Sequence, residues 1–185
     1  IKIKIGAINF EDELSLIKKI RTEFGKNDIE IRVDANGAFT PKKAPTVLNK
    51  LAYLDIHSIE QPISAGQPIE MKKLCENTPI PIALDEELIN LFNEEEKNEL
   101  LQYISPQYII LKPSLLGGFK ETNEWIKVAS ENNISWWVTS ALESNIGLNA
   151  IAQYCGNFNN PLPQGLGTGG LYSNNFISPL TLNGQ

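Results

Sequence analysis

Two kinds of apolar pattern alternate along the chain. Ile and Lys alternate over the first five residues, as in a strand with one buried face. Residues 11–20 then have acidic residues first, apolar residues at helical spacing and basic residues last, as in a helix. The same order repeats along the chain. The expected strands are residues 1–5, 29–34, 56–60, 80–85, 107–112, 134–139 and, with a weaker pattern, 162–165. The expected helices are residues 11–20, 41–51, 69–75, 94–103, 118–132 and 145–154, with Thr40 as N-cap and Pro41 at the first position of the second one.

This alternation predicts an α/β fold in which helices cover a parallel sheet. Strand patterns recur roughly every 25 residues, the length of one strand and helix unit, and no linker composition interrupts them. We therefore expect a single domain over residues 1–185. A closed TIM-type (β/α) barrel has eight strands, whereas seven are expected here. Because the chain begins at Ile1 directly in a strand pattern, we expect a barrel that lacks its first strand.

Composition narrows the function classes. The chain has 185 residues, of which 42% are hydrophobic, enough for one buried core. A formal net charge of -6 argues against nucleic acid as a partner. No run approaches the roughly 20 apolar residues that cross a bilayer, and the N-terminus has no signal-peptide pattern, so we expect a cytoplasmic protein without a membrane partner. Cys75 and Cys155 stand in helix patterns without a Cys-x-x-Cys pair, and we interpret both as small buried apolar residues.

Ionisable side chains stand at the carboxyl end of five expected strands. They are Lys4, Asp34, Glu60, Asp85 and Lys112. The carboxyl ends of parallel strands lie on one rim, where barrels of this kind carry their active sites, so we expect these five side chains to lie together. The two-residue period of a strand puts Lys2 and Lys4 opposite the isoleucines, and we expect both lysines to be buried inside the barrel.

Three of these side chains, Asp34, Glu60 and Asp85, are carboxylates, which repel one another at short distance unless a cation lies between them. An all-oxygen ligand set of this kind suits Mg²⁺, with Mn²⁺ as an alternative, and leaves positions for a substrate carboxylate. Each carboxylate on its own is more simply explained as a helix cap or an ion-pair partner. The three together, next to inward-facing lysines, favour the metal site.

Lysines on both sides of such a metal site indicate proton transfer at a carbon acid. A divalent cation that holds a substrate carboxylate makes the neighbouring carbon acidic, and a lysine can then remove its proton. Salt bridges to the three acids explain Lys4 and Lys112 equally well when each lysine is considered alone. A catalytically silent domain with a structural ring of ion pairs therefore stays open as the alternative to an enzyme.

Five segments in this order resemble the enolase superfamily, specifically its Lys/Lys subgroup, which includes the muconate-lactonizing enzymes. They are Lys2-Ile3-Lys4, Arg32-Val33-Asp34-Ala35-Asn36-Gly37, Ile59-Glu60-Gln61-Pro62, Leu84-Asp85-Glu86 and Leu111-Lys112-Pro113. The resemblance implies Mg²⁺-dependent chemistry with Lys4 as the base, Lys112 as the opposed lysine and the three carboxylates as metal ligands. It also implies an N-terminal α+β capping domain, which we expect to be missing from these residues.

Within the superfamily, residues 139–147 and 165–169 most resemble the family of o-succinylbenzoate synthases. The two-residue period points His57, the only histidine, away from Glu60, which disfavours the sugar-acid dehydratases, and residues 164–170 lack the Asp-x-Asp of dipeptide epimerases. The resemblance implies dehydration of 2-succinyl-6-hydroxy-2,4-cyclohexadiene-1-carboxylate to o-succinylbenzoate through an enediolate, in menaquinone biosynthesis. N-succinylamino acid racemase and dipeptide epimerase are the alternatives.

Further residues are expected to contact the substrate or to support the site. The expected substrate contacts are Lys2, Ser140, Gly165 and Gly167. Asn36 and Glu86 are expected to orient the metal ligands. The expected partners are a small-molecule carboxylate substrate and the missing capping domain, with a homo-oligomer as an option. We expect the 185 residues alone to be poorly active.

Overall fold

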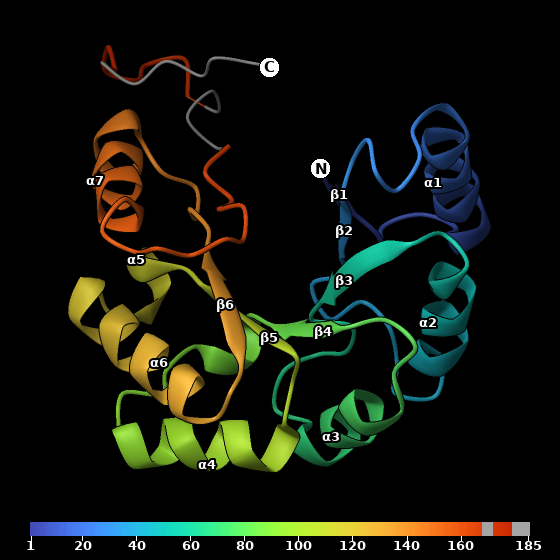
Figure 1. The fold of residues 1–185 in the computed structure, drawn as a ribbon, viewed down its shortest axis with the longest axis horizontal. Coiled ribbons are helices and arrows are strands. Elements are labelled where there is room, and N and C mark those ends of the chain that lie inside the picture. The colour runs from blue at the N-terminus through green and yellow to red at the C-terminus, as the bar shows by residue number, and fades with distance from the viewer. Residues whose placement is uncertain (168–171, 179–185) are drawn as a thin grey trace.

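The structure of the protein, a computed structural model, describes residues 1–167 and 172–178. Its centre is one sheet of six parallel strands, in which each strand pairs with its neighbours in chain order. These are β1 (Lys2–Lys4), β2 (Ile31–Asp34), β3 (Ile56–Glu60), β4 (Ile82–Leu84), β5 (Tyr108–Leu111) and β6 (Ser135–Val138). Figure 1 shows the strands in an arc that runs from β1 to β6. Over the described residues, the sheet is thus an open part of a parallel barrel.

The long helices follow the strands and lie on the outer side of the arc (Figure 1). The helices of the described residues are α1 (Phe10–Glu23), α2 (Ala44–Ala52), α3 (Pro68–Asn77), η1 (Glu86–Leu88), α4 (Glu94–Ile104), α5 (Pro113–Leu116), α6 (Phe119–Glu131) and α7 (Asn145–Cys155). None of the helices in this part of the chain combines the length and the hydropathy that a membrane span requires. The alternation of strands and helices confirms the predicted α/β fold class.

The helix prediction is wrong in two details. α2 begins at Ala44 rather than at Pro41, because residues 41–43 form a separate turn. Thr40 caps that turn, since its Oγ1 accepts a hydrogen bond from the Lys43 N–H at 3.3 Å. The sequence pattern also does not predict η1 and α5, because three or four residues are too few to display a helical period.

Two apolar layers hold the sheet. Strand side chains such as Val33 and Ile59 face outward and are fully buried against the helices. A smaller cluster of Ala83, Ile110 and Trp137 packs separately from this outer core. Burial of a side chain of this size contributes about 1.5–3 kcal/mol, so the larger outer layer supplies most of the apolar stabilisation. The inner face can therefore carry polar side chains.

The amino end of the inner face is filled by aromatic and basic side chains. The Arg32 guanidinium lies 4.2 Å from the centre of the Trp137 ring, and its Nε donates a hydrogen bond to Glu30 at 2.7 Å. The His57 ring stacks on Tyr108 with 5.2 Å between centroids and also lies edge-on to Trp137. The prediction that His57 points to the opposite face from Glu60 is therefore wrong, because the pairing of β2 with β3 shifts register between Ile31 and Arg32.

The weak strand pattern at residues 162–165 corresponds to a single parallel bridge between Thr139 and Gly165, at the end of β6. Gly165 N–H donates to Val138 O at 2.8 Å, and Ser140 N–H donates to Gly165 O at 2.9 Å. A Cβ atom at position 165 would lie 2.6 Å from Thr139 Cγ2, so the close approach of the two backbones requires glycine. Packing against Thr139 therefore accounts for this glycine without a ligand.

Candidate active site

The three predicted carboxylates lie at neighbouring strand ends. Asp34 and Glu60 are the last residues of β2 and β3 and stand opposite each other in the pairing register. Asp85 directly follows β4, and Ala83 of β4 pairs with Glu60. All three residues are buried, with 0%, 3% and 4% of their surface exposed. The apolar strands thus carry three acidic groups into one water-poor region at the carboxyl edge of the sheet.

Three lysines bind these carboxylates. Lys2 Nζ lies 2.8 Å from Asp34 and 2.6 Å from Glu60, and Lys4 Nζ lies 2.5 Å from Asp34. Lys112, which follows β5, forms ion pairs with Glu60 at 3.4 Å and with Asp85. The structure thus brings all five predicted strand-end residues together with Lys2 in one chain of alternating charges.

The lysines of β1 are less buried than predicted. Ile5 is buried and Ile3 packs against the outer core, so Lys2 and Lys4 are on the inner face as expected. Their side chains are nevertheless 35% and 61% exposed. The reason is that β1 is an edge strand of the described sheet and is paired only with β2 on its other side.

Burial and neighbouring charges act differently on the acids. Burial raises the pKa of Glu60 to about 8, because the attraction of Lys2 and Lys112 is partly offset by the nearby Asp34 and Asp85 carboxylates. Burial acts in the same direction on Asp34, but Lys2 and Lys4 outweigh it and hold the pKa of Asp34 below its usual range. The lysines therefore compensate Asp34 better than Glu60.

The donor chemistry of this cluster fits a hard divalent cation, because three carboxylates from adjacent strands supply only oxygen ligands and one of them, the buried Glu60, is poorly compensated by the lysines. Their positions in the structure are those of ion pairs. Within residues 1–167 and 172–178, no three His, Cys, Asp or Glu side chains have the mutual arrangement of a metal-ligand group. A cation at this site would therefore have to replace some of the contacts between the lysines and the carboxylates. The arrangement that is observed is one of ion pairs.

Asn36 and Glu86 connect to this cluster through Lys4. Lys4 Nζ donates to Asn36 Oδ1 at 2.6 Å, and Asn36 Nδ2 donates to Glu86 Oε1 at 2.8 Å. The Asn36 N–H also donates to Asp34 Oδ1 at 3.0 Å. These contacts agree with a supporting role, but they orient the expected base Lys4 as well as the expected ligand Asp34.

The remaining predicted contacts lie beyond β6. Ser140 is buried and its hydroxyl lies 3.4 Å from Gly165 O, so these two residues are neighbours across the bridge described above. Gly167 is exposed, and a Cβ atom added there would have no neighbour within 4 Å. The structure thus places Ser140 and Gly165 together, whereas Gly167 has free space around its α-carbon.

Sequence reasoning missed two buried polar residues near the carboxylates, Gln61 and Glu87. Gln61 Nε2 donates to Glu87 Oε2 at 3.1 Å, and Gln61 Oε1 accepts the Asp85 N–H at 3.1 Å. Gln61 directly follows the predicted ligand Glu60, and Glu87 directly follows Glu86. That adjacency is the only signal in the sequence, because the contacts depend on how β3 and β4 meet.

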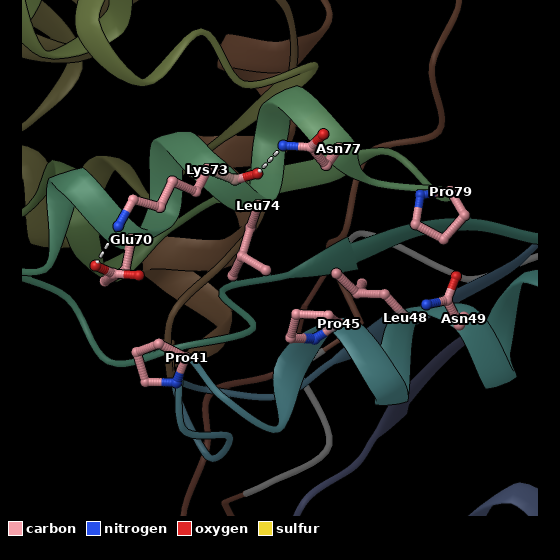
Figure 2. Close-up of a pocket in the computed structure, with 9 residues that line it drawn as sticks. All are labelled: Pro41, Pro45, Leu48, Asn49, Glu70, Lys73, Leu74, Asn77 and Pro79. Carbon is pink, nitrogen blue, oxygen red and sulfur yellow. Dashed lines mark hydrogen bonds and ion pairs between the residues drawn. The ribbon is translucent and has the colours of Figure 1, made fainter.

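Two hollows of the described surface lie away from this cluster. A pocket of about 260 Å³ lies between α2 and α3 on the outer side of the sheet, and Figure 2 shows its lining. Leu48 and Leu74 face each other across it, and Lys73 binds Glu70 at 2.9 Å. A second hollow of about 420 Å³ is lined by residues near the amino end of β6, including Ser135 and Trp136. Neither contains a predicted site residue.

The comparison with known families agrees with this arrangement. Residues 1–179 match the family described as enolase C-terminal domain-like. The chain belongs to this family. The o-succinylbenzoate synthase of Desulfotalea psychrophila is 54% identical over 184 residues, which are 100% of this chain and 50% of that protein. An L-Ala-D/L-Glu epimerase of Bacillus subtilis is 30% identical and is matched over 83% of this chain and 42% of its own length.

Solved structures of the enolase family give the same result. The crystal structure of MenC from Desulfotalea psychrophila superposes with a TM-score of 0.92 at 52% identity, over 98% of this chain and 50% of that one. The muconate lactonizing enzyme from Pseudomonas putida superposes with a TM-score of 0.80 at 27% identity, over 89% and 45%. The chain therefore spans about half the length of the relatives that it matches.

Proposed function

We propose that this chain carries the catalytic barrel of a Mg²⁺-dependent o-succinylbenzoate synthase, a carbon-oxygen lyase of menaquinone biosynthesis. The observation that carries the proposal is the convergence of Lys4, Asp34, Glu60, Asp85 and Lys112 at adjacent strand ends. The 54% identity to an o-succinylbenzoate synthase over the whole chain supports this choice of reaction. Residues 1–185 then form one domain, which acts in the cytoplasm on a small-molecule carboxylate together with an N-terminal capping domain.

The metal ligands of the proposal are Asp34, Glu60 and Asp85. A bound Mg²⁺, or Mn²⁺ in its place, would hold the ring carboxylate of 2-succinyl-6-hydroxy-2,4-cyclohexadiene-1-carboxylate and make the carbon beside it acidic. Lys2, which binds two of these carboxylates in the structure, would then be free to contact the substrate. Loss of the lysine contacts would be compensated by the positive charge of the cation.

Lys4 and Lys112 divide the proton chemistry. In its neutral form, Lys4 Nζ takes the proton from the carbon that bears the carboxylate. The protonated Lys4 then gives this proton to the departing 6-hydroxyl, so one water leaves and the new double bond completes the aromatic ring. Lys112 stays protonated and stabilises the negative charge that develops on the carboxylate side. Asn36 Oδ1 accepts a hydrogen bond from Lys4 Nζ and would help to hold this amine in place for the proton transfer.

The test is an ultraviolet assay on the full-length protein with the cyclohexadiene substrate, in the presence of Mg²⁺ and after its removal by EDTA. We expect rapid formation of o-succinylbenzoate that depends on Mg²⁺. The matched measurement follows thermal stability against Mg²⁺ concentration, because a metal site gains stability with concentration whereas a structural ring of ion pairs does not. Absence of both effects would contradict the proposal and favour the catalytically silent domain.

A second candidate function is racemisation of an N-succinylamino acid or epimerisation of a dipeptide by the same two lysines. The 30% identity to an L-Ala-D/L-Glu epimerase favours keeping this candidate. Both substrates carry a carboxylate next to the carbon that loses a proton, so the metal and lysine roles would be unchanged. Exchange of the α-hydrogen in D₂O without formation of o-succinylbenzoate would identify this activity.

A further inference from the structure

We infer that Gln61 is a positioning residue that ties together the three backbone segments that carry Asp34, Glu60 and Asp85, and thereby sets the metal affinity of the site. The inference rests on the proposed function and adds to it a residue that the proposed mechanism does not use. It is carried by hydrogen bonds of Gln61 to the segments that follow β2 and β4.

Gln61 directly follows Glu60 and is completely buried. Its side-chain Oε1 accepts the N–H groups of Asp85 at 3.1 Å and Glu87 at 3.4 Å. Its Nε2 donates to Ile63 O at 3.0 Å and to Glu87 Oε2 at 3.1 Å. An amide side chain has two acceptor positions and two N–H donors, so all four are used inside the protein.

The backbone of Gln61 explains why its side chain is needed. At Glu60 the regular pairing of β3 with β4 ends, and the Gln61 N–H still donates to Ala83 O at 2.9 Å. In a continuing parallel ladder the Gln61 carbonyl would accept the Asp85 N–H next. Instead, Gln61 has a left-handed φ of 39° and its carbonyl accepts the Gly37 N–H at 2.7 Å. The side-chain oxygen takes the place of that carbonyl at Asp85.

One residue therefore joins three loops. The Gln61 carbonyl binds the segment after Asp34 through the Gly37 N–H, and the Gln61 side chain binds the backbone N–H of Asp85. Gln61 is also bonded directly to Glu60 in the chain. A left-handed conformation is unfavourable for a non-glycine residue, so the hydrogen bonds of Gln61 must outweigh a local strain. Metal ligands need their relative positions held to within a fraction of an ångström, and groups behind the ligands supply that constraint.

Glu87 is the second buried side chain of this hydrogen-bond network. Its Oε1 accepts the Gly66 N–H at 3.0 Å while its Oε2 accepts from Gln61, so the carboxylate is held at both oxygens. Gln61 and Glu87 thus form one donor and acceptor pair in a buried setting. Removal of one member leaves the other without its partner, which is costly in such surroundings.

The experiment compares Gln61→Met with Gln67→Met in the full-length protein. Both changes replace an amide by an apolar chain of similar length, but within the described residues the Gln67 side chain hydrogen-bonds only to the Ser64 carbonyl, away from the three carboxylates. Isothermal calorimetry with Mg²⁺ and electron paramagnetic resonance with Mn²⁺ report the affinity independently of turnover. We expect Gln61→Met to weaken metal binding by about tenfold or more and Gln67→Met to leave it within about twofold.

A purely structural role for Gln61 would lower the melting temperature and leave the metal affinity of the folded protein unchanged, and this result would overturn the inference. If Gln61→Met does not fold, Glu87→Gln tests the same contact with a smaller change. The double variant Gln61→Glu with Glu87→Gln restores a donor and an acceptor between these two side chains but leaves the Ile63 carbonyl without its donor, so we expect it to regain only part of the affinity that Glu87→Gln loses. A wild-type protein that binds neither metal would instead overturn the proposed function itself.

Discussion

Lys97 and Lys112 each bind two carboxylates in different regions of the protein, and a comparison of the two regions shows when such a cluster indicates a site. Lys97 of α4 is completely buried, and its Nζ lies 2.6 Å from Glu121 and 2.7 Å from Glu124 of α6. Lys112 makes the corresponding bridge at the carboxyl edge of the sheet. Ion pairing and burial of the lysine are therefore common to both regions and do not distinguish them.

The carboxylates make the difference. Glu121 and Glu124 keep 16% and 20% of their side chains exposed, and Lys97 lowers the pKa of Glu121. At the sheet edge the acids are more completely buried, and burial raises the pKa of Glu60 to about 8 despite two lysines. The cluster around Lys97 links two helices through acids that are partly in contact with water. The cluster around Lys112 holds three almost completely buried carboxylates, and at Glu60 burial outweighs the attraction of the lysines, a setting that a metal ion would relieve.

The largest effect that separates the two regions is expected at Lys4. Lys4→Ala removes the proposed base, so proton exchange at the acidic carbon of the substrate should fall by at least about 100-fold, the usual contribution of a positioned acid or base. Nuclear magnetic resonance of the full-length protein with substrate in D₂O measures this exchange, and calorimetry should give Mg²⁺ affinity close to that of the wild type. Lys97→Met is the matched control and should keep its turnover. Exchange that persists in Lys4→Ala would remove Lys4 from the mechanism.

The next effect concerns the acids. Asp34→Asn, Glu60→Gln and Asp85→Asn each remove one proposed ligand charge and should weaken Mg²⁺ binding by more than tenfold, whereas Glu124→Gln in the helix cluster should not change it. At 100 times the wild-type dissociation constant, Mg²⁺ should stabilise the wild type by about 2.7 kcal/mol and a tenfold weaker variant by about 1.4 kcal/mol. Thermal unfolding with and without Mg²⁺ checks this. Unchanged affinity in all three variants would reject the ligand set.

The comparison also explains how far the sequence predicts the molecule. Six strands and the six longer helices follow from apolar periodicity, and the strand-end residues such as Asp34 and Lys112 follow from the rule that parallel strands end on one rim. The period fails at His57, because a shift of register between two strands is a tertiary event. The contacts of Gln61 are not predicted for the same reason. Its left-handed backbone lets its side chain bind Asp85 after the neighbouring strand, and the local sequence does not specify which strand that is.

The third effect is one of stability. Lys97→Met leaves Glu121 and Glu124 facing each other without a cation, and we expect the free energy of unfolding to fall by about 2 kcal/mol. This is below the usual cost of breaking a buried pair, because both carboxylates reach water. Denaturant unfolding of the full-length protein measures the change. A loss of turnover with unchanged stability would mean that the helix cluster belongs to the functional site, and the distinction drawn above would fail.

The smallest effect is expected at Lys127, which joins the same two helices at the surface. Its Nζ binds Glu94 of α4, and the two side chains are 55% and 49% exposed. Water and salt weaken such a pair, so Lys127→Met should lower the free energy of unfolding much less than Lys97→Met does, and addition of salt to the wild type should have a similarly small effect. A loss as large as that of Lys97→Met would show that the α4 and α6 contact depends on total charge rather than on burial. Burial would then no longer separate the helix cluster from the candidate active site.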